Sequence, residues 1–253
     1  MILLLIASAG VKTVKAYDKT GHLIVAQVAN KNLSKKARKA LEKLLGENGI
    51  VYYANWADEI KSDHAYDWAS KLHYYNFDKE YTASDMDQAF EKAAATPASL
   101  IHAIDSLVRV LKSNHNDTEA VKFLVHFVGD LSQPLHLGHT KDRGGNAIRV
   151  RWFRDSTNLH TLWDNYMVEF EKLSYTEYAD YLMQSDRLTK PAYSDRTVKK
   201  LFTDSYLISQ KIYAYSYNRM NEYSYFFNFG NSLKQSMLNG GYLLARLLNE
   251  IYG

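Results

Sequence analysis

One stretch near the middle of the chain limits the possible fold more than any other. Residues 117–132 are apolar on most faces of a predicted helix, yet that helix contains His126 and Asp130. A helix that is hydrophobic all round is buried, and a buried carboxylate is costly unless it is paired or bound to a metal. The two side chains leave the same helix face, about 6 Å apart along the axis. Pro134 ends the helix, which lets His136 return toward the same space.

The same spacing occurs a second time in the chain. In the segment Asn158-Leu-His160-Thr-Leu-Trp-Asp164, a histidine and an aspartate are again four residues apart on a predicted helix. One such pair alone is more often a structural ion pair than a metal site. Further candidate ligands lie elsewhere in the sequence: His22, Asp58 and His73. Imidazoles and carboxylates without thiolates are typical of zinc. One ion cannot use so many ligands, whereas three ions share them well if Asp130 bridges two.

The composition narrows the chemistry further. The chain contains no Cys, which excludes disulfides, thiolate zinc sites and a thiol nucleophile. Its 31 basic and 28 acidic residues give a net charge of +3. If Lys12 and Lys15 were removed with an amino-terminal leader, 29 basic and 28 acidic residues would remain, for a net charge of +1. This balance argues against tight electrostatic binding to duplex DNA. The charge of a polyanionic substrate must then be met locally, and bound metal ions are one way to do so.

The amino terminus resembles a secretion signal. Residues 2–10 are almost wholly apolar, and Val14-Lys15-Ala16 resembles a cleavage site with small residues. We predict a signal peptide over residues 1–16 and a mature domain over residues 17–253. The destination would be outside the cell, or the lumen of a lysosome or vacuole. The alternative is that this apolar segment is a buried part of the fold.

Two further sequence patterns bear on location. Sequons at Asn32 and Asn116 predict glycosylation if a eukaryotic cell secretes the protein. Outside the amino terminus, no apolar run approaches the ~20 residues that a membrane span needs. We therefore expect a glycoprotein that has no stable association with a membrane and that is a monomer.

Helical periodicity recurs along the chain, so the expected fold class is mostly α. Helices are predicted over residues 33–45, 85–95, 97–113, 117–132, 156–172, 174–186, 196–218 and 230–251. Pro97 suits the first turn of its predicted helix. Only residues 146–153 alternate in polarity, which predicts one strand or one arm of a hairpin. With 46% hydrophobic residues and no linker or repeat, the sequence predicts a single-domain multi-helix bundle with at most a small β-hairpin.

Taken together, these motifs resemble the S1/P1 nuclease family, which includes 3'-nucleotidases and shares its fold with zinc-dependent phospholipase C. The resemblance covers essentially the whole mature chain. The segments that carry it are Tyr17-Asp-Lys-Thr-Gly21-His22, Trp56-Ala57-Asp58, Leu72-His73-Tyr74-Tyr75-Asn76-Phe77, His126-Phe-Val-Gly-Asp130-Leu-Ser-Gln-Pro-Leu-His136, Gly144-Gly145-Asn146, Asn158-Leu-His160-Thr-Leu-Trp-Asp164 and Gly241-Tyr-Leu-Leu-Ala-Arg-Leu-Leu-Asn249.

The resemblance implies three zinc ions as cofactors. Asp58, His73, His126 and Asp130 would hold one zinc. His136, His160 and Asp164 would hold a second. The free amine and carbonyl of Tyr17, together with His22 and a bridging Asp130, would hold the third. A terminal amine becomes a neutral donor only after the peptide bond before it is cut, so removal of the signal peptide would also complete this site.

The resemblance also implies an activity and a set of substrate contacts. The protein would be a zinc-dependent endonuclease that hydrolyses single-stranded DNA and RNA to 5'-phosphate products and also acts on 3'-nucleotides. Asp58 would orient the nucleophile, and Lys61 would neutralise phosphoryl oxygens. Tyr74 would stack a base, a contact worth about 1–3 kcal/mol, or would be an ordinary core aromatic. Asn76 would hydrogen-bond the base.

The chain departs from the family pattern at several of these positions. Tyr17 replaces the usual first Trp, which does not prevent ligation through the main chain. Lys61 replaces Arg and loses its bidentate fork. Asn76 replaces Asp, which broadens the expected base preference.

Two further residues near these motifs are candidates for the site. His139, three residues after His136, is a candidate outer partner of the metals. Asn146 is either a turn residue or a ligand contact.

Two other functions fit parts of the pattern. A zinc-dependent phospholipase C would have Glu in place of Asp164 in the second motif, and the segment around Tyr74 favours a base over a lipid headgroup. A non-catalytic zinc-binding secreted protein would need only the four ligands of a structural zinc site, and this chain has more.

Overall fold

Helices account for most of the chain, which confirms the mostly α fold class. The computed structural model describes residues 19–218 and 220–253, so the predicted signal peptide and Tyr17 lie outside the described residues. The α-helices are α1 (Lys19–Lys31), α2 (Lys35–Leu45), α3 (Gly49–Tyr52), α4 (Trp56–Glu59), α5 (Met86–Ala95), α6 (Leu100–Ser113), α7 (Thr118–Leu131), α8 (Leu159–Thr161), α9 (Met167–Glu169), α10 (Tyr175–Gln184), α11 (Val198–Tyr213) and α12 (Glu222–Tyr252). Short helical turns of other types are η1 (Ile60–Ser62), η2 (His64–Ala69), η3 (Ala83–Asp85), η4 (Pro134–Leu137), η5 (Thr140–Asp142), the π-helical η6 (Leu162–Tyr166) and η7 (Tyr193–Asp195).

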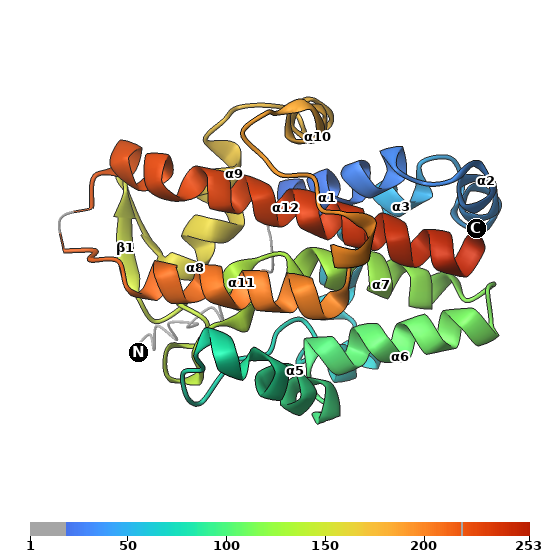
Figure 1. The fold of residues 1–253 in the computed structure, drawn as a ribbon, viewed down its shortest axis with the longest axis horizontal. Coiled ribbons are helices and arrows are strands. Elements are labelled where there is room, and N and C mark those ends of the chain that lie inside the picture. The colour runs from blue at the N-terminus through green and yellow to red at the C-terminus, as the bar shows by residue number, and fades with distance from the viewer. Residues whose placement is uncertain (1–18, 219) are drawn as a thin grey trace, which may run out of the picture.

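The one sheet among the described residues is a small antiparallel hairpin, as predicted. Strand β1 (Arg149–Trp152) pairs with β2 (Asp155–Asn158), with Arg149 opposite Asn158 and Trp152 opposite Asp155. The hairpin lies at one end of the bundle (Figure 1). It leads directly into α8 and thereby positions the second His-x-x-x-Asp motif.

The longest helix, α12, runs along much of the length of the molecule, with α11 beside it (Figure 1). Helices α1, α7 and α10 also pack against α12, while α6 covers α7. As a result α7 lies inside the bundle, and nearly all of its side chains from Ala120 to Leu131 are buried. The apolar sequence of α7 therefore has the burial that its composition predicts.

One predicted helix is wrong over its first residues. Residues 156–158 of the predicted helix 156–172 belong to β2, and the chain becomes helical only at Leu159. The Asn158 side chain accepts a hydrogen bond from the Thr161 amide at 2.8 Å and caps the helix there. The short polar residues Ser156 and Thr157 are compatible with a helix as well as with a strand, so periodicity alone did not distinguish the two.

Other helix boundaries also differ from the prediction. Pro97 precedes α6 rather than lying in its first turn, because Ser99 caps that helix by accepting a hydrogen bond from the His102 amide at 3.0 Å. The predicted helix 230–251 extends back to Glu222, since Asn221 supplies the cap. Helix α1, which carries His22, was not predicted.

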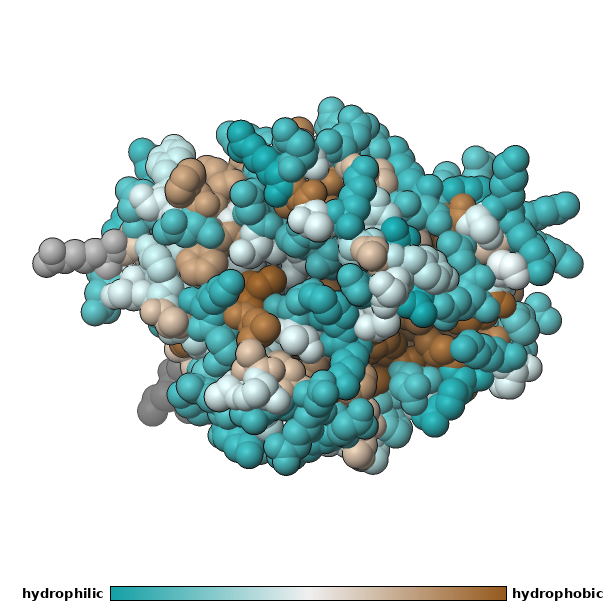
Figure 2. Space-filling view, in the orientation of Figure 1, coloured by the Kyte–Doolittle hydropathy of each residue, from teal (hydrophilic) through white to brown (hydrophobic). Residues whose placement is uncertain are grey.

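The face of the molecule in Figure 2 is mostly hydrophilic, and its apolar side chains are confined to small areas between polar ones. Among residues 19–218 and 220–253, no helix combines the length and the apolar character that crossing a bilayer would require.

The contact between α12 and α1 depends on a glycine. A Cβ added at Gly241 would lie 2.5 Å from two side-chain atoms of Val28 and 3.0 Å from the Val25 carbonyl oxygen. We expect Gly241→Ala to lower the free energy of unfolding by about 1–3 kcal/mol, the usual cost of overpacking, as measured by urea denaturation. Asn228→Ala, at an exposed position of the same helix, is the control. Equal stability of the two variants would contradict this packing.

Candidate metal centre

Candidate ligands from distant parts of the chain meet in the interior. Helix α7 contributes His126 and Asp130, both fully buried. The turn η4 contributes His136, and the buried His73 follows η2. Helix α1 contributes His22, and α4 contributes Asp58. His160 lies on α8 and Asp164 on η6. The structure thus brings together every predicted His and Asp ligand within the described residues.

The first group has the dimensions of a tetrahedral zinc site. His126 Nε2 lies 3.1 Å from His73 Nδ1, 3.3 Å from Asp130 Oδ2 and 3.6 Å from Asp58 Oδ1. His73 Nδ1 lies 2.9 Å from Asp130 Oδ2 and 3.9 Å from Asp58 Oδ1. A tetrahedron with metal–ligand bonds of about 2.0–2.1 Å has edges of about 3.3–3.4 Å, which is the middle of this range. These four residues fit one zinc ion.

The electrostatics of this group also call for a cation. Burial alone would raise the pKa of Asp130, but His126, His136 and His73 outweigh it and hold that pKa well below its usual value. Burial would lower the pKa of His126, but Asp130 and Asp58 reverse the effect and raise it. The histidines thus favour the charged form of Asp130, and the two carboxylates favour a positive charge at His126. A bound metal ion supplies positive charge at the same place, and its ligation requires neutral imidazole.

The second group is built from the second sequence motif. His136, His160 and Asp164 each offer one ligand atom within 4.8 Å of the others, and His160 Nε2 lies 3.2 Å from Asp164 Oδ2. Burial, with a further contribution from His136, lowers the pKa of His160 to about 3. His160 is therefore neutral near pH 7, as a metal ligand must be.

Three of the histidines are fixed in one orientation by main-chain acceptors. The Nδ1–H groups of His126, His136 and His160 donate to the carbonyl oxygens of Ala54 (2.9 Å), His73 (2.7 Å) and Gly144 (2.7 Å), respectively. This leaves each Nε2 lone pair directed away from the main chain. His136 Nε2 is buried and has no hydrogen-bond partner among the described residues. Histidines that ligate metals are typically oriented in this way.

His22 lies beside the first group rather than apart from it. Its ring stacks on that of His126 with 3.9 Å between centroids, and its Nε2 lies 3.5 Å from Asp130 Oδ1. It also forms a possible metal-binding group with Asp58 and His126. Burial and the neighbouring His126 lower the pKa of His22 well below its usual value. The Tyr17 amine of the predicted third site lies outside the described residues.

A cleft of about 750 Å³ opens beside both groups. It is lined by His73, His136 and His160 together with the predicted substrate residues Lys61, Tyr74 and Asn76. Lys61 forms an ion pair with Asp58. Tyr74 is 41% exposed and is therefore not a core aromatic. The metal groups thus face a space large enough for a nucleotide.

The sequence of residues 17–253 matches the family described as S1/P1 nuclease. The chain belongs to this family. It is 29% identical to Endonuclease 2 of Arabidopsis thaliana in an alignment of 277 positions that covers 95% of this chain and 92% of that protein. It is 28% identical to Nuclease P1 of Penicillium citrinum, covering 92% and 97% of the two chains. Over 73% of this chain and 66% of the relative, it is 30% identical to Nuclease S1 of Aspergillus oryzae.

Membership makes this S1/P1 nuclease a phosphodiesterase that hydrolyses nucleic acids. The non-catalytic alternative is therefore set aside. The family is generally zinc-dependent, and this chain has His and Asp groups able to bind metal.

One residue of the central motif acts on the metal site without having been singled out in the sequence. In this S1/P1 nuclease, Gln133 is fully buried and donates from Nε2 to Asp164 Oδ1 at 2.5 Å. Its Oε1 accepts from the Leu135 amide at 2.5 Å, which fixes the orientation of the side-chain amide. Gln133 therefore holds Asp164 toward the second group. The only sequence signal was its place just before Pro134, where a polar residue has no obvious need to be buried.

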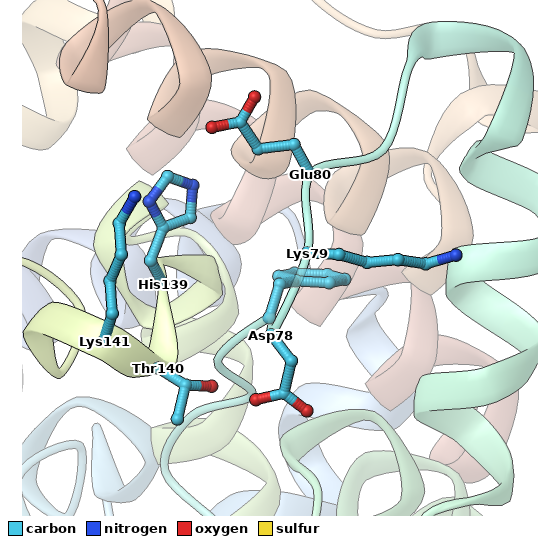
Figure 3. Close-up of a pocket in the computed structure, with 7 residues that line it drawn as sticks. Asp78, Lys79, Glu80, His139, Thr140 and Lys141 are labelled. Carbon is cyan, nitrogen blue, oxygen red and sulfur yellow. The ribbon is translucent and has the colours of Figure 1, made fainter.

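The structure places the His139 ring against Tyr213 and Asp142 rather than against a predicted metal ligand. Its ring stacks on Tyr213 at 4.0 Å, and its Nδ1 lies 3.8 Å from Asp142 Oδ2. It lines a separate hollow of about 650 Å³, where Figure 3 shows it near Lys141 and Glu80. Asn146 lines the metal-side cleft while its side chain donates to the Arg143 carbonyl oxygen at 2.9 Å. Asn146 is thus both a turn residue and part of the cleft wall.

Proposed function

We propose that this nuclease is a secreted monomer that uses three zinc ions to cut single-stranded DNA and RNA, and that it also hydrolyses 3'-nucleotides. The observation that carries the proposal is the shared position of Asp130. Its Oδ2 lies 2.9 Å from His73 Nδ1 and 3.3 Å from His126 Nε2, while its Oδ1 lies 3.3 Å from His136 Nδ1 and 3.5 Å from His22 Nε2. One carboxylate in the midst of four histidines is suited to bridging metal ions.

The described ligands divide into the sets that the sequence implies. Asp58, His73, His126 and Asp130 would hold one zinc, and His136, His160 and Asp164 a second. His22 and Asp130, with the Tyr17 amine, would hold a third. When bound, zinc acts as a Lewis acid and lowers the pKa of a bound water toward neutral pH.

The remaining roles fall to side chains of the cleft. Lys61 lies close enough to Asp58 to pair with it, and its ammonium group would neutralise phosphoryl oxygens beside the metals. Asp58 would orient the attacking water. Attack of water on phosphorus, in line with the P–O3' bond, would break that bond. The products would be a 3'-hydroxyl on one nucleotide and a 5'-phosphate on the next.

Single strands fit this cleft better than duplexes do. Tyr74 presents an exposed aromatic face at the cleft, and the buried Asn76 Oδ1 has no hydrogen-bond partner among the described residues. A base can stack on Tyr74 and hydrogen-bond to Asn76 only after it has left its stack in a duplex. Because Asn76 can both donate and accept, we propose that several bases are accepted.

The proposed secretion rests on the leader and its link to the third zinc. The family match begins at residue 17, the residue that cleavage after Ala16 would expose. Location in a lysosomal or vacuolar lumen would need the same cleavage. Of the two sequons, Asn116 is exposed, whereas the amide of Asn32 donates to the Val28 carbonyl oxygen at 2.7 Å. Glycosylation is therefore proposed for Asn116.

The contact of α7 with His22 offers a selective test of the third zinc. A Cβ at Gly129 would lie 2.5 Å from His22 Nδ1, so Gly129→Ala must displace that ring. We expect this variant to bind one zinc fewer than the wild-type protein and to lose about tenfold or more in kcat/KM, as metal-site disruptions do. Zinc counting by atomic absorption and a melting curve provide the measurement. A Gly129→Ala protein that folds and keeps the wild-type zinc content would argue against His22 as a ligand.

The substrate assignment is tested by direct comparison of substrates. Denatured DNA, RNA, duplex DNA and a 3'-mononucleotide are offered to the zinc-loaded protein, with phosphatidylcholine vesicles as the phospholipase C control. The proposal predicts rapid release of 5'-phosphate products from the two single strands, phosphate release from the 3'-nucleotide, and no phosphocholine. Equal rates on duplex and single strands, or phosphocholine release, would overturn it.

A further inference from the structure

Arg143 has a backbone conformation that an arginine seldom adopts. It ends η5 with φ 57° and ψ 49°, in the left-handed region. Residues other than glycine rarely occupy this region, and Asn and Asp are enriched among those that do. The strain fits a residue whose side chain is needed at this place.

The side chain of Arg143 lines the cleft beside the metal groups. Its guanidinium group makes no hydrogen bond or ion pair with any residue in the described part of the chain. Lys61, another cation of the same cleft, is by contrast paired with Asp58. Arg143 is thus a charged group that remains available to a ligand.

The main chain next to Arg143 is fixed against both the metal site and the predicted base site. The carbonyl oxygen of Gly144 accepts from His160 Nδ1 at 2.7 Å. A Cβ at Gly144 would lie 3.2 Å from Asn76 Oδ1. The Asp142 carboxylate accepts from the Gly145 amide at 2.6 Å and holds the turn in place. The main chain of Arg143 is therefore held in place by contacts of the residues on either side of it.

We propose that Arg143 binds a phosphate of the substrate strand next to the one being cleaved, and so favours polynucleotides over substrates with a single phosphate. A guanidinium fork matches phosphate geometry, and the cleft supplies a further exposed cation, Lys71, against one exposed carboxylate, Asp67. This inference rests on the proposed position of the scissile phosphate at the metal groups.

The test compares two substrates and two matched variants. Thymidylyl-thymidine contains one phosphodiester and no other phosphate, whereas decathymidylate has neighbouring phosphates. Arg143→Gly removes the side chain at a position whose backbone favours glycine, so its melting temperature should be no lower than that of the wild-type protein. Lys172→Gly is the control, because Lys172 is exposed, has φ 55° and does not line the cleft.

We expect Arg143→Gly to raise KM for decathymidylate about tenfold or more, the effect of losing a charge-assisted hydrogen bond, while kcat/KM for thymidylyl-thymidine stays within about twofold. The salt dependence of log kcat/KM for decathymidylate should lose about 0.7 in slope, as expected for one phosphate contact with a single strand. Arg143→Lys should recover part of the lost affinity. Lys172→Gly should change neither substrate's kinetics.

Equal losses on both substrates, or no loss on either, would overturn the role given to Arg143. Both substrates are single-stranded diesters. The ratio between them therefore stays interpretable if the proposed strand preference, zinc number or 3'-nucleotidase activity fails on its own tests.

Discussion

Asp130→Asn is expected to reduce nuclease activity by about 10³-fold or more, while the chain remains folded. The two oxygens of Asp130 face four histidines in a fully buried position. The nearly isosteric amide has no charge, and it presents an NH₂ group where a ligand oxygen is required. Stabilisation by bound metal amounts to several kcal/mol of transition-state energy, and each 1.36 kcal/mol is a factor of ten in rate.

The measurement is kcat/KM on denatured DNA, together with zinc per chain and the far-UV circular dichroism spectrum. Asp105→Asn is the control, because Asp105 is exposed on α6 and pairs only at the surface with Arg109 at 3.1 Å. We expect that variant to match the wild-type enzyme. An Asp130→Asn protein with the full zinc content and activity within about threefold of wild type would mean that Asp130 is not a metal ligand.

Removing zinc with a chelator is expected to abolish activity and to lower the melting temperature by about 10–20 °C. A ligand present at 100 times its Kd stabilises the folded state by about 2.7 kcal/mol per site, and for a chain of this size each kcal/mol shifts the melting temperature by about 2–4 °C. The two sites whose ligands all lie within the described residues account for this range. Without metal, the charge of the fully buried Asp130 carboxylate is offset by neighbouring histidines rather than by a divalent cation.

Scanning calorimetry before and after chelation gives this shift, and added zinc should restore both stability and activity. Magnesium should restore neither, because it prefers oxygen ligands in octahedral geometry and the sites are rich in imidazole. The shift should be smaller in Asp130→Asn, since that variant has less zinc to lose. A melting temperature that moves by less than about 2 °C on complete removal of zinc would show that metal binding and folding are not coupled here.

The central part of the metal site was predictable from the sequence for a local reason. His126 and Asp130 are four residues apart on a helix too apolar to lie at the surface, so their burial and common direction follow from helix geometry alone. His160 and Asp164 repeat that spacing, although the chain there is π-helical over residues 162–166. Local spacing did not reveal the π-turn.

The convergence of the distant ligands could not be derived in the same way. Asp58 and His73 lie more than 50 residues from His126, and no local pattern relates them. Only the resemblance to a family linked them, and the structure now places their ligand atoms within 4 Å of His126 Nε2. The same limit applies to Gln133 and Arg143, whose roles depend on side-chain direction and on a left-handed backbone that the sequence does not display.

The fold was predictable in class but less so in its boundaries. Burial on both sides made α7 unmistakable, whereas the polar residues 155–158 became a strand because β1 supplied a partner. Helix α1 was missed although it carries His22 and packs between α12 and α10. Its identity depends on those tertiary neighbours, which override a weak local preference.

The most direct test of the account is anomalous diffraction at the zinc absorption edge from crystals of the mature protein. We predict a peak of anomalous density among Asp58 Oδ1, His73 Nδ1, His126 Nε2 and Asp130 Oδ2, with ligand distances of about 2.0–2.2 Å. A second peak is predicted among His136, His160 and Asp164. If these side chains instead form direct hydrogen bonds with no zinc density between them, in a protein that is still active, the zinc-centred account is wrong.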